Sequence, residues 1–352
     1  MREIQGLSYP LFIGDFWEVL LTRISELAPS QVFVLVDQNT KAHCLPVFLD
    51  KTGFSDSKLI VVPSGERFKS LETCQQIWRS LFKYKADRHS LLINLGGGVI
   101  GDMGGFCASV YMRGIPFIQV PTTLLSQVDA SVGSKLGVDF NGFKNSLGSF
   151  RDPEGVYIAP GFLATLCDRE LLSGYAEIVK HALIRDEALW RALPKELSRE
   201  HDLSEIIHDS VKIKRDIVQA DPLEKGPRKL LNFGHTIGHA IESVMLESSE
   251  PWLHGESIAA GMICESHVAL QCNLLGPEEL KTLSDKILSI FGYKAIPASS
   301  FTRIVEKTRL DKKNKSGRIM CTLLEGIGNG TYDKEISEAH ILKGLEYYTN
   351  FE

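Results

Sequence analysis

The first half of the chain alternates short apolar runs with amphipathic segments, and this alternation restricts the fold more than any other feature of the sequence. The runs are rich in Val, Ile and Leu and lie at residues 31–37, 58–63, 90–95 and 117–121. Continuous apolar runs of this length are typical of strands buried on both faces of a parallel sheet. Helical patterns such as residues 68–84 lie between them. The alternation predicts a Rossmann-like, doubly wound α/β domain.

The pattern changes at about residue 165, where apolar residues begin to recur at spacings of three and four. Such spacing predicts helices at residues 168–185, 203–220, 230–246, 255–273 and 277–291. A strand-like run remains at 318–323. We therefore expect an α/β domain at 1–165 and a mostly helical domain at 166–352. The default place for an active site is the cleft between two such domains.

Composition excludes several classes of protein. The length of 352 residues suits two domains, and a net charge of −5 gives no reason to expect a nucleic-acid partner. The longest apolar stretch, residues 91–111, contains Asp102 and several glycines, so no membrane span is expected. The N-terminus lacks a signal-peptide pattern, and the seven scattered cysteines are typical of reduced thiols. These features predict a cytoplasmic protein.

A glycine-rich loop, residues 96–102, follows one predicted strand and precedes a helical segment. Glycines there would let the backbone approach a pyrophosphate at a helix N-terminus. A tight strand-to-helix turn explains the same residues equally well, so both interpretations stay open. Thr122 and Thr123 end another predicted strand, which is where open α/β sheets bind ligands.

Four residues in the second half have the chemistry of a metal site. His235 and His239 are four residues apart, which places both imidazoles on one face of a helix. His254 and Glu177 are further candidates, each in or next to a predicted helix. A carboxylate with two or three imidazoles is the composition of a catalytic zinc site. Any one of these histidines could be an ordinary core or surface residue, but together they favour a metal.

Lysines and arginines recur beside small polar residues along the chain. Each alone is expected to be a solvated charge. Several lie next to glycine or inside apolar helices, where a purely solvated role is less expected. Converging cations would suit a substrate that carries both phosphate and carboxylate.

Five blocks of sequence, in order, resemble the 3-dehydroquinate synthase family. They read GGGVIGDMGGFCASVYMRGIPFIQVPTTLLSQVDASVGSK from residue 96, FKNSLGSF from 143, GYAEIVKHALI from 174, RKLLNFGHTIGHAIE from 228 and LHGE from 253. The likeness extends from about residue 63 to 313. This family belongs to the sugar-phosphate cyclases and shares its fold with iron-dependent alcohol and glycerol dehydrogenases.

The resemblance implies a cytoplasmic, homodimeric enzyme of the shikimate pathway that uses NAD and a divalent metal, Zn²⁺ or Co²⁺. Its substrate would be 3-deoxy-D-arabino-heptulosonate 7-phosphate, converted to 3-dehydroquinate and phosphate. The steps would be transient oxidation, β-elimination of phosphate, re-reduction, ring opening and aldol closure.

The resemblance also implies roles for individual residues. The metal ligands would be Glu177, His235 and His254, which splits the histidine pair and leaves His239 to the substrate. The catalytic groups would be Lys135, Asn145, Lys180, Glu224 and His239. The substrate would contact Arg113, Asp129, Lys135, Asn145, Lys180, Lys214, Arg228, Asn232, His239 and one of Lys312 and Lys313, with Arg113 reaching the partner subunit's site. The cofactor would lie along Asp37, Glu66, Lys69, Gly97, Gly98, Val99, Gly101, Asp102, Thr122, Thr123, Lys135, Lys144, Phe162, Leu163, Ala164 and Thr165.

Two departures and three alternatives accompany this hypothesis. The usual glycine pair before the substrate lysine reads Gly133-Ser134, and Pro227 precedes Arg228. A cyclase acting on sedoheptulose 7-phosphate is the nearest alternative, but its substrate lacks the carboxylate that Arg228 and Asn232 would recognise. A metal-dependent polyol dehydrogenase would not need the lysine-rich set, and a non-catalytic binding protein would leave the metal residues unexplained.

Overall fold

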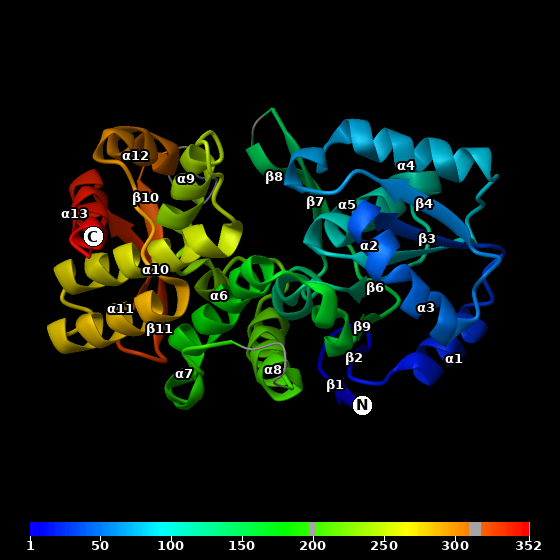
Figure 1. The fold of residues 1–352 in the computed structure, drawn as a ribbon, viewed down its shortest axis with the longest axis horizontal. Coiled ribbons are helices and arrows are strands. Elements are labelled where there is room, and N and C mark those ends of the chain that lie inside the picture. Colours follow the sequence, from blue (N-terminus) through cyan, green and yellow to red (C-terminus); the bar gives the residue numbers. More distant parts are fainter. Residues whose placement is uncertain (142, 198–201, 310–317, 352) are drawn as a thin grey trace. The chain divides into compact units, whose positions relative to one another are not determined.

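The computed structural model describes residues 1–141, 143–197, 202–309 and 318–351 (Figure 1). The chain divides into two compact units. The first comprises Met1–Cys167 with Asp202–Gln219, and the second comprises Asp168–His201 with Ala220–Glu352. Residues 202–219 thus group with the first unit, although they follow the expected boundary in the sequence. Within the described ranges, no helix has the length and apolarity needed to cross a membrane.

The first unit is built on a seven-stranded sheet in the order β1-β2-β9-β6-β5-β3-β4. The four predicted apolar runs form its parallel strands β3 (Val32–Asp37), β4 (Lys58–Val62), β5 (Leu91–Gly96) and β6 (Phe117–Pro121). The edge strands β1 (Arg2–Ile4) and β2 (Leu11–Ile13) pair antiparallel, and β9 (Val156–Ile158) runs parallel between β2 and β6. The predicted doubly wound α/β fold is confirmed.

Both faces of this sheet are buried, which explains why the strands read as unbroken apolar runs. Phe33 and Leu35 face one core, together with α4 (Leu71–Lys83) and α5 (Gly98–Val110). Val34 and Val36 face the other core, which α1 (Trp17–Leu27) and α3 (Leu45–Thr52) cover. Side chains that alternate along one strand therefore supply two separate cores.

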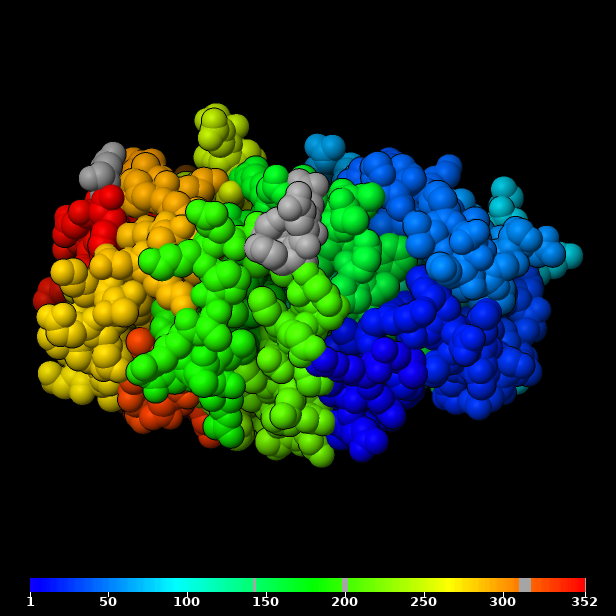
Figure 2. Space-filling model, turned by 60° about the horizontal axis from the view of Figure 1, so that its bottom comes forward, coloured from blue at the N-terminus to red at the C-terminus, as the bar shows by residue number. Residues whose placement is uncertain are grey.

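Two parts of the first unit come from outside the α/β alternation. An antiparallel hairpin, β7 (Lys135–Phe140) with β8 (Phe143–Phe150), forms a sheet of its own. Helix α8 (Ser204–Ala220) joins from far along the chain. Arg2 forms an ion pair with Glu205, and Arg215 donates to the carbonyl of Gln5. Figure 2 shows α8, in yellow-green, in contact with the dark-blue N-terminal residues.

The second unit is mostly helical, as predicted. Its elements are α6 (Asp168–Arg185), α7 (Glu187–Ala192), α9 (His235–Met245), α10 (His254–Gln271), α11 (Pro277–Phe291), α12 (Phe301–Arg309), β10 (Ile319–Leu324), β11 (Gly330–Ile336) and α13 (Glu338–Thr349). Helix α10 is central, because α6, α9, α11, α13 and β10 all pack against it. This explains why α10 is apolar or small on nearly every face, with Ile258, Met262 and Val268 fully buried.

One helix expected from the sequence is divided in the structure. The apolar spacing predicted a continuous helix over 230–246, but residues Pro227–Asn232 form a short 3₁₀ helix and α9 begins only at His235. Gly234 separates the two in the left-handed region at φ 77°. Helical spacing on both sides of the break concealed it, because a 3₁₀ turn and an α-turn place apolar residues at similar intervals.

Candidate active site

The candidate metal residues of the second unit come from three helices. Glu177 lies in the middle of α6, His235 and His239 occupy the first turns of α9, and His254 is the first residue of α10. All three helices pack together, since α10 contacts both α6 and α9. Residues that are 58 or more positions apart from Glu177 in the sequence therefore share one site.

The distances within this group suit a single bound cation. The Oε1 atom of Glu177 lies 3.4 Å from Nε2 of His235 and 3.4 Å from Nε2 of His254. Ligand atoms of His235, His239 and His254 all lie within 4.8 Å of one another. Ligands held at about 2.0–2.2 Å around a tetrahedral ion are separated by roughly 3.3–3.5 Å. Glu177, His235 and His254 match that spacing.

The Oε1 atom of Glu177 provides the strongest evidence that a metal fits here. Glu177 is completely buried, and this oxygen has no hydrogen-bond partner within the described parts of the chain. A buried carboxylate oxygen is costly unless it is paired or coordinates a metal. The Nδ1 atom of His235 lies 3.0 Å from the carbonyl of Phe233, so Nδ1 carries the proton and Nε2 remains a donor to metal.

The electrostatics of the group also favour a cation. Burial alone would raise the pKa of Glu177, but Lys180, His235 and His254 outweigh it and hold that pKa well below its usual range. Lys180 is itself buried and ion-paired with Oε2 of Glu177. Burial opposes charge on His254, yet Glu242 and Glu177 raise the pKa of that imidazole to about 9. The carboxylates of Glu177 and Glu242 thus favour a positive charge beside His254.

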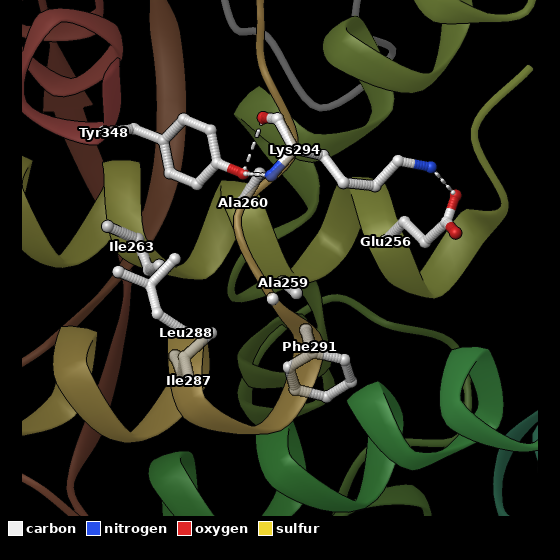
Figure 3. Close-up of a pocket in the computed structure, with 10 residues that line it drawn as sticks. Glu256, Ala259, Ala260, Ile263, Ile287, Leu288, Phe291, Lys294 and Tyr348 are labelled. Atoms are coloured by element: carbon white, nitrogen blue, oxygen red, sulfur yellow. Dashed lines mark hydrogen bonds and ion pairs between the residues drawn. The ribbon is translucent and has the colours of Figure 1, made fainter. Parts of the chain in front are cut away.

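Glu256 fixes the start of α10, where His254 stands. Its carboxylate accepts from the backbone N–H of Leu253 at 2.7 Å and pairs with Arg169 and Lys294. Figure 3 shows the ion pair of Lys294 with Glu256 at a cavity beside α10. The hydroxyl of Tyr348 is hydrogen-bonded to the backbone of Lys294. That cavity has a volume of about 10 Å³, which is room for one water and not for a substrate.

The segment before α9 presents two predicted substrate residues, Arg228 and Asn232, and the predicted catalytic residue Glu224. The guanidinium of Arg228 is almost fully buried and donates to the carbonyl of Pro222 at 2.6 Å. Asn232 donates to Oε1 of Glu224 at 2.9 Å. Glu224 has a positive φ of 58°, a conformation that few non-glycine residues adopt. Asp221 holds the loop by accepting backbone N–H groups from Lys225, Gly226 and Arg228.

In the first unit, the expected cofactor residues gather at the carboxyl edge of the sheet. Asp37 ends β3 and caps α2 (Gln38–His43), Gly97 and Gly98 follow β5, and Thr122 and Thr123 follow β6. The chain continues from β3 to β4 on one side and returns to β5 on the other, so β3 and β5 flank a topological switch point. Residues 98–102 of the glycine-rich segment form the first turns of α5, and Gly97 is the N-cap. Cβ atoms at Gly97 and Gly98 would lie 3.0 Å and 3.3 Å from neighbouring side chains.

Lys69 links the glycine-loop helix to the β7–β8 hairpin. Its ammonium is buried and lies 2.6 Å from Oδ2 of Asp102 and 2.6 Å from Oδ1 of Asn145. Burial opposes charge on Lys69, but Asp102 and Glu66 more than compensate and raise its pKa. Lys144 lies 3.4 Å from Oε1 of Glu66. The structure therefore brings five predicted residues into one polar cluster.

Other predicted residues of the first unit are more dispersed. Lys214 of α8 pairs with Oδ1 of Asp129 at 2.5 Å. Lys135 is exposed at the start of β7, and Ser134 before it has a φ of 61° where a glycine was expected. Arg113 is exposed and lies in a tight turn after α5. Both Arg113 and the preceding Met112 have positive φ values, 67° and 50°.

For two sets of predicted residues, the structure does not show side chains available to a ligand. Phe162 and Leu163 are buried in the short 3₁₀ helix Pro160–Thr165, and Phe162 packs in the core beside Trp17. Only the backbone of that segment, with the exposed Ala164 and Thr165, could face a ligand. Lys312 and Lys313 lie outside the described residues.

Sequence reasoning missed two buried carboxylates near the histidines. Glu242 follows His235 and His239 at helical spacing on α9, and Glu265 lies in the apolar helix α10. Both are at most 3% exposed. The sequence did contain a signal for them, because an acidic residue inside an apolar helix is rarely buried without a partner.

Comparison with protein families gives consecutive matches over most of the chain. Residues 59–173 match the model of the 3-dehydroquinate synthase N-terminal domain. Residues 174–314 match the model of the C-terminal domain. The 3-dehydroquinate synthase of Parabacteroides distasonis is 38% identical over 328 residues, covering 92% of this chain and 93% of that protein. The enzyme of a Sulfurovum species is 42% identical over 325 residues, covering 90% and 91%.

Solved structures show the same fold. The 2-epi-5-epi-valiolone synthase of Streptomyces hygroscopicus, solved with NAD⁺ and Zn²⁺ bound, has a TM-score of 0.85 and 25% identity, with 100% of this chain and 99% of that chain covered. A 2-deoxy-scyllo-inosose synthase has a TM-score of 0.85 at 23% identity, with 98% and 99% covered. An NADH-dependent butanol dehydrogenase of Thermotoga maritima has a TM-score of 0.64 at 13% identity, covering 96% of each chain.

Proposed function

This chain belongs to the 3-dehydroquinate synthase family, and from that membership we propose how its own residues carry out the reaction. The enzyme converts 3-deoxy-D-arabino-heptulosonate 7-phosphate to 3-dehydroquinate and phosphate, and it depends on NAD and a divalent metal. The observation that best supports this assignment of residues is the buried Oε1 of Glu177, which accepts no hydrogen bond within the described parts of the chain and lies 3.4 Å from Nε2 of both His235 and His254.

Glu177, His235 and His254 would hold the divalent cation, and the residues of the sheet edge would hold NAD. When bound, the cofactor takes a hydride from the substrate and returns it, while the cation polarises hydroxyl oxygens on the same ring. Lys180 neutralises the second oxygen of Glu177, so that the carboxylate keeps its charge in a buried position. Asp37, Gly97 and Gly98 would contact the cofactor at the switch point between β3 and β5.

The substrate carries two anionic groups, and we assign different residues to each. Arg228 and Asn232 would recognise the carboxylate, with Arg228 already fixed by its bond to the Pro222 carbonyl. Lys135 and Asn145 would hold the phosphate. Asn145 lies near the turn of the hairpin, where it accepts from Lys69, and Lys135 begins β7 at the open end of the same hairpin. His239 would accept a proton from the substrate. It is half-buried, and its ring centroid is 4.9 Å from that of His235.

The direct test is an assay of the purified protein with the heptulosonate phosphate, catalytic NAD⁺ and Zn²⁺. Phosphate and 3-dehydroquinate should form in equal amounts without accumulation of NADH, because the hydride is returned within each turnover. Stoichiometric NADH would instead indicate a polyol dehydrogenase. The variant His235→Ala should lose bound metal and activity together, whereas the surface control His89→Ala should keep both. Full activity of metal-free His235→Ala would contradict the assignment.

We further propose that the working enzyme is a cytoplasmic homodimer in which Arg113 acts in the partner subunit's site. Exposed apolar side chains around this residue support the proposal: Val110, Met112 and Phe150 are 50%, 39% and 51% exposed. They lie on adjoining segments, because Ser109 and Ser149 share a hydrogen bond and Arg151 donates to the end of α5. Exposed apolar side chains on adjoining segments are typical of an interface.

Mixing two inactive variants tests whether Arg113 acts in the partner's site. Subunits carrying Arg113→Ala and His235→Ala would each be inactive alone. Random reassortment into mixed dimers should restore about a quarter of the wild-type sites, because only sites that combine intact residues from both chains are complete. No recovery, with subunit exchange verified by size-exclusion chromatography of differently tagged chains, would show that Arg113 acts within its own chain.

A further inference from the structure

Two buried carboxylates on neighbouring helices lie next to the metal histidines and have no part in the proposed reaction. We infer that each helix positions the histidine carried by the other: Glu265 of α10 fixes His235 of α9, and Glu242 of α9 fixes His254 of α10. This inference rests on the proposed metal site. It assigns to these two residues a positioning role, which should appear first in the affinity and geometry of the bound metal.

Glu265 supplies the cap that α9 lacks. The N-cap residue of α9 is Gly234, which has no side chain to accept a hydrogen bond from the first helical turn. The Oε2 atom of Glu265 accepts from the N–H of Gly234 at 2.6 Å, and Oε1 accepts from the N–H of Ile237 at 2.9 Å. These two N–H groups lie on either side of His235 in the sequence. The carboxylate therefore fixes the backbone from which His235 projects.

Glu242 acts on the other histidine. Its Oε2 atom lies 3.4 Å from Nδ1 of His254, while Nε2 of His254 faces Oε1 of Glu177 at 3.4 Å. A carboxylate on the far nitrogen of an imidazole fixes the ring orientation and keeps the proton on that nitrogen. The near nitrogen is then free to donate its electron pair to a metal. Glu242 is only 3% exposed, so water does not compete for this contact.

The helices pack so closely that they leave little room for compensating movement. A Cβ added to Gly261 of α10 would lie 2.1 Å from the carbonyl oxygen of Gly234, and one added to Gly238 of α9 would lie 3.0 Å from the carbonyl oxygen of Ser257. Backbone touches backbone here. If replacement of Glu242 or Glu265 shifts the backbone, the nearby histidine moves relative to the other metal ligands, because no flexible side chains lie between the helices here to take up the shift.

Metal affinity in competition with a chromophoric chelator is the decisive measurement. We expect Glu242→Gln and Glu265→Gln to bind Zn²⁺ roughly 10-fold more weakly, and Glu242→Ala and Glu265→Ala roughly 100-fold more weakly, as for other residues that orient metal ligands. Each Gln variant keeps one acceptor oxygen, so it should recover part of the loss. The visible absorption of bound Co²⁺ should also shift in Glu242→Gln, because the ring of His254 is free to turn.

Val268→Ala is the matched control for stability. Val268 is fully buried on α10, so truncation should lower the melting temperature measured in chelator without moving a metal ligand. Wild-type affinity in this control with weaker binding in the Glu variants supports the inference. Equal loss of affinity in Val268→Ala at equal loss of melting temperature would overturn it. So would affinities of all four Glu variants within two-fold of wild type.

The same titration separates this inference from the proposed metal site. If His235→Ala binds Zn²⁺ as tightly as the wild type, the proposed site itself is wrong. If His235→Ala loses the metal but the Glu242 and Glu265 variants keep both affinity and Co²⁺ spectrum, the site stands and the positioning role fails.

Discussion

At the scale of single residues, Asp221 shows how one carboxylate can organise a functional loop. Its two oxygens accept the N–H groups of Lys225, Gly226 and Arg228 at 3.0, 2.6 and 3.2 Å. Burial of Asp221 opposes its ionisation, but these three hydrogen bonds outweigh burial and lower its pKa. The loop that carries Glu224 and Arg228 therefore depends on an ionised Asp221.

The variant Asp221→Asn should be less stable than the wild type, and the difference should depend on pH. An amide offers one acceptor oxygen in place of two, so about 1–3 kcal/mol of unfolding free energy should be lost at pH 7. Because the folded-state pKa is lowered, the wild-type advantage is complete above the unfolded value of about 3.9 and disappears as pH falls through the folded value. Urea unfolding at pH 7 and pH 3.5 measures this. A difference that stayed constant over that range would contradict the role of the charge.

The sequence predicts some residues of the site better than others, for a physical reason. Glu177, His235 and His254 are chemically distinctive, and the blocks around them have a recognisable order. Glu242 and Glu265 were missed, because the sequence shows only that an acidic residue stands inside an apolar helix and does not show which helix packs against it. Lys69 is similar: its partners Asp102 and Asn145 are 33 and 76 residues away. Only the folded chain shows that these groups meet.

At the scale of elements, prediction succeeded where burial determines the sequence pattern. The strands β3, β5 and β6 are buried on both faces, so their apolar runs are unbroken and easily found. The edge strand β4 buries Ile60 and Val62 and leaves Val61 exposed, but its run is apolar enough to be found as well. The hairpin β7–β8 was missed, because much of it is exposed and it contains three glycines. The strand β2 was missed because it has only three residues. Short or exposed strands leave too little periodicity to recognise.

The junction between α9 and α10 gives a prediction at this scale. In Gly234→Ala, the new Cβ would lie 2.6 Å from Cγ of Met262 and 3.2 Å from the carbonyl oxygen of Ile258, at a φ of 77°. We expect a loss of about 1–2 kcal/mol from the left-handed backbone and a further 1–3 kcal/mol from overpacking. Bound Zn²⁺ should weaken as well, because His235 is the next residue.

Gly53→Ala is the matched control for this prediction. Gly53 caps α3 at a φ of 71°, but a Cβ at this position would have no atom within 4 Å of it among the described residues. Gly53→Ala should lose only the part of the unfolding free energy that comes from the left-handed backbone, about 1–2 kcal/mol, and should bind Zn²⁺ as the wild type does. Thermal unfolding of both variants measures the difference. Equal destabilisation of the two would show that contact with α10 contributes nothing at Gly234.

At the scale of the whole molecule, the seven cysteines report on how completely the chain is folded. None forms a disulfide, and five of them are buried: Cys44, Cys74, Cys107, Cys264 and Cys321. Cys167 is exposed, and Cys272 is intermediate. Burial raises the pKa of Cys44 to about 11 and also raises that of Cys272, so neither thiol is ionised to a large extent near neutral pH. Fast native reactivity should be confined to Cys167.

Titration with Ellman's reagent at pH 8 should therefore detect one fast thiol, with Cys272 slower and the remaining five reactive only in denaturant. Cys167→Ser should remove the fast phase and leave the melting temperature unchanged, because its side chain lies at the surface. Rapid reaction of three or more thiols in the native protein would show that one of the cores is open in solution.

The division of the chain into interleaved segments has a consequence for its synthesis. The first unit needs residues 202–219, which are made only after residues 168–201 of the second unit. At typical ribosomal rates, the roughly 50 residues from 168 to 219 take about 3–10 s to appear. During that interval the ion pairs of Asp129 with Lys214 and of Arg2 with Glu205 cannot form. The sheet of the first unit is therefore made before its last helix, and the surface that α8 covers stays exposed until that helix appears.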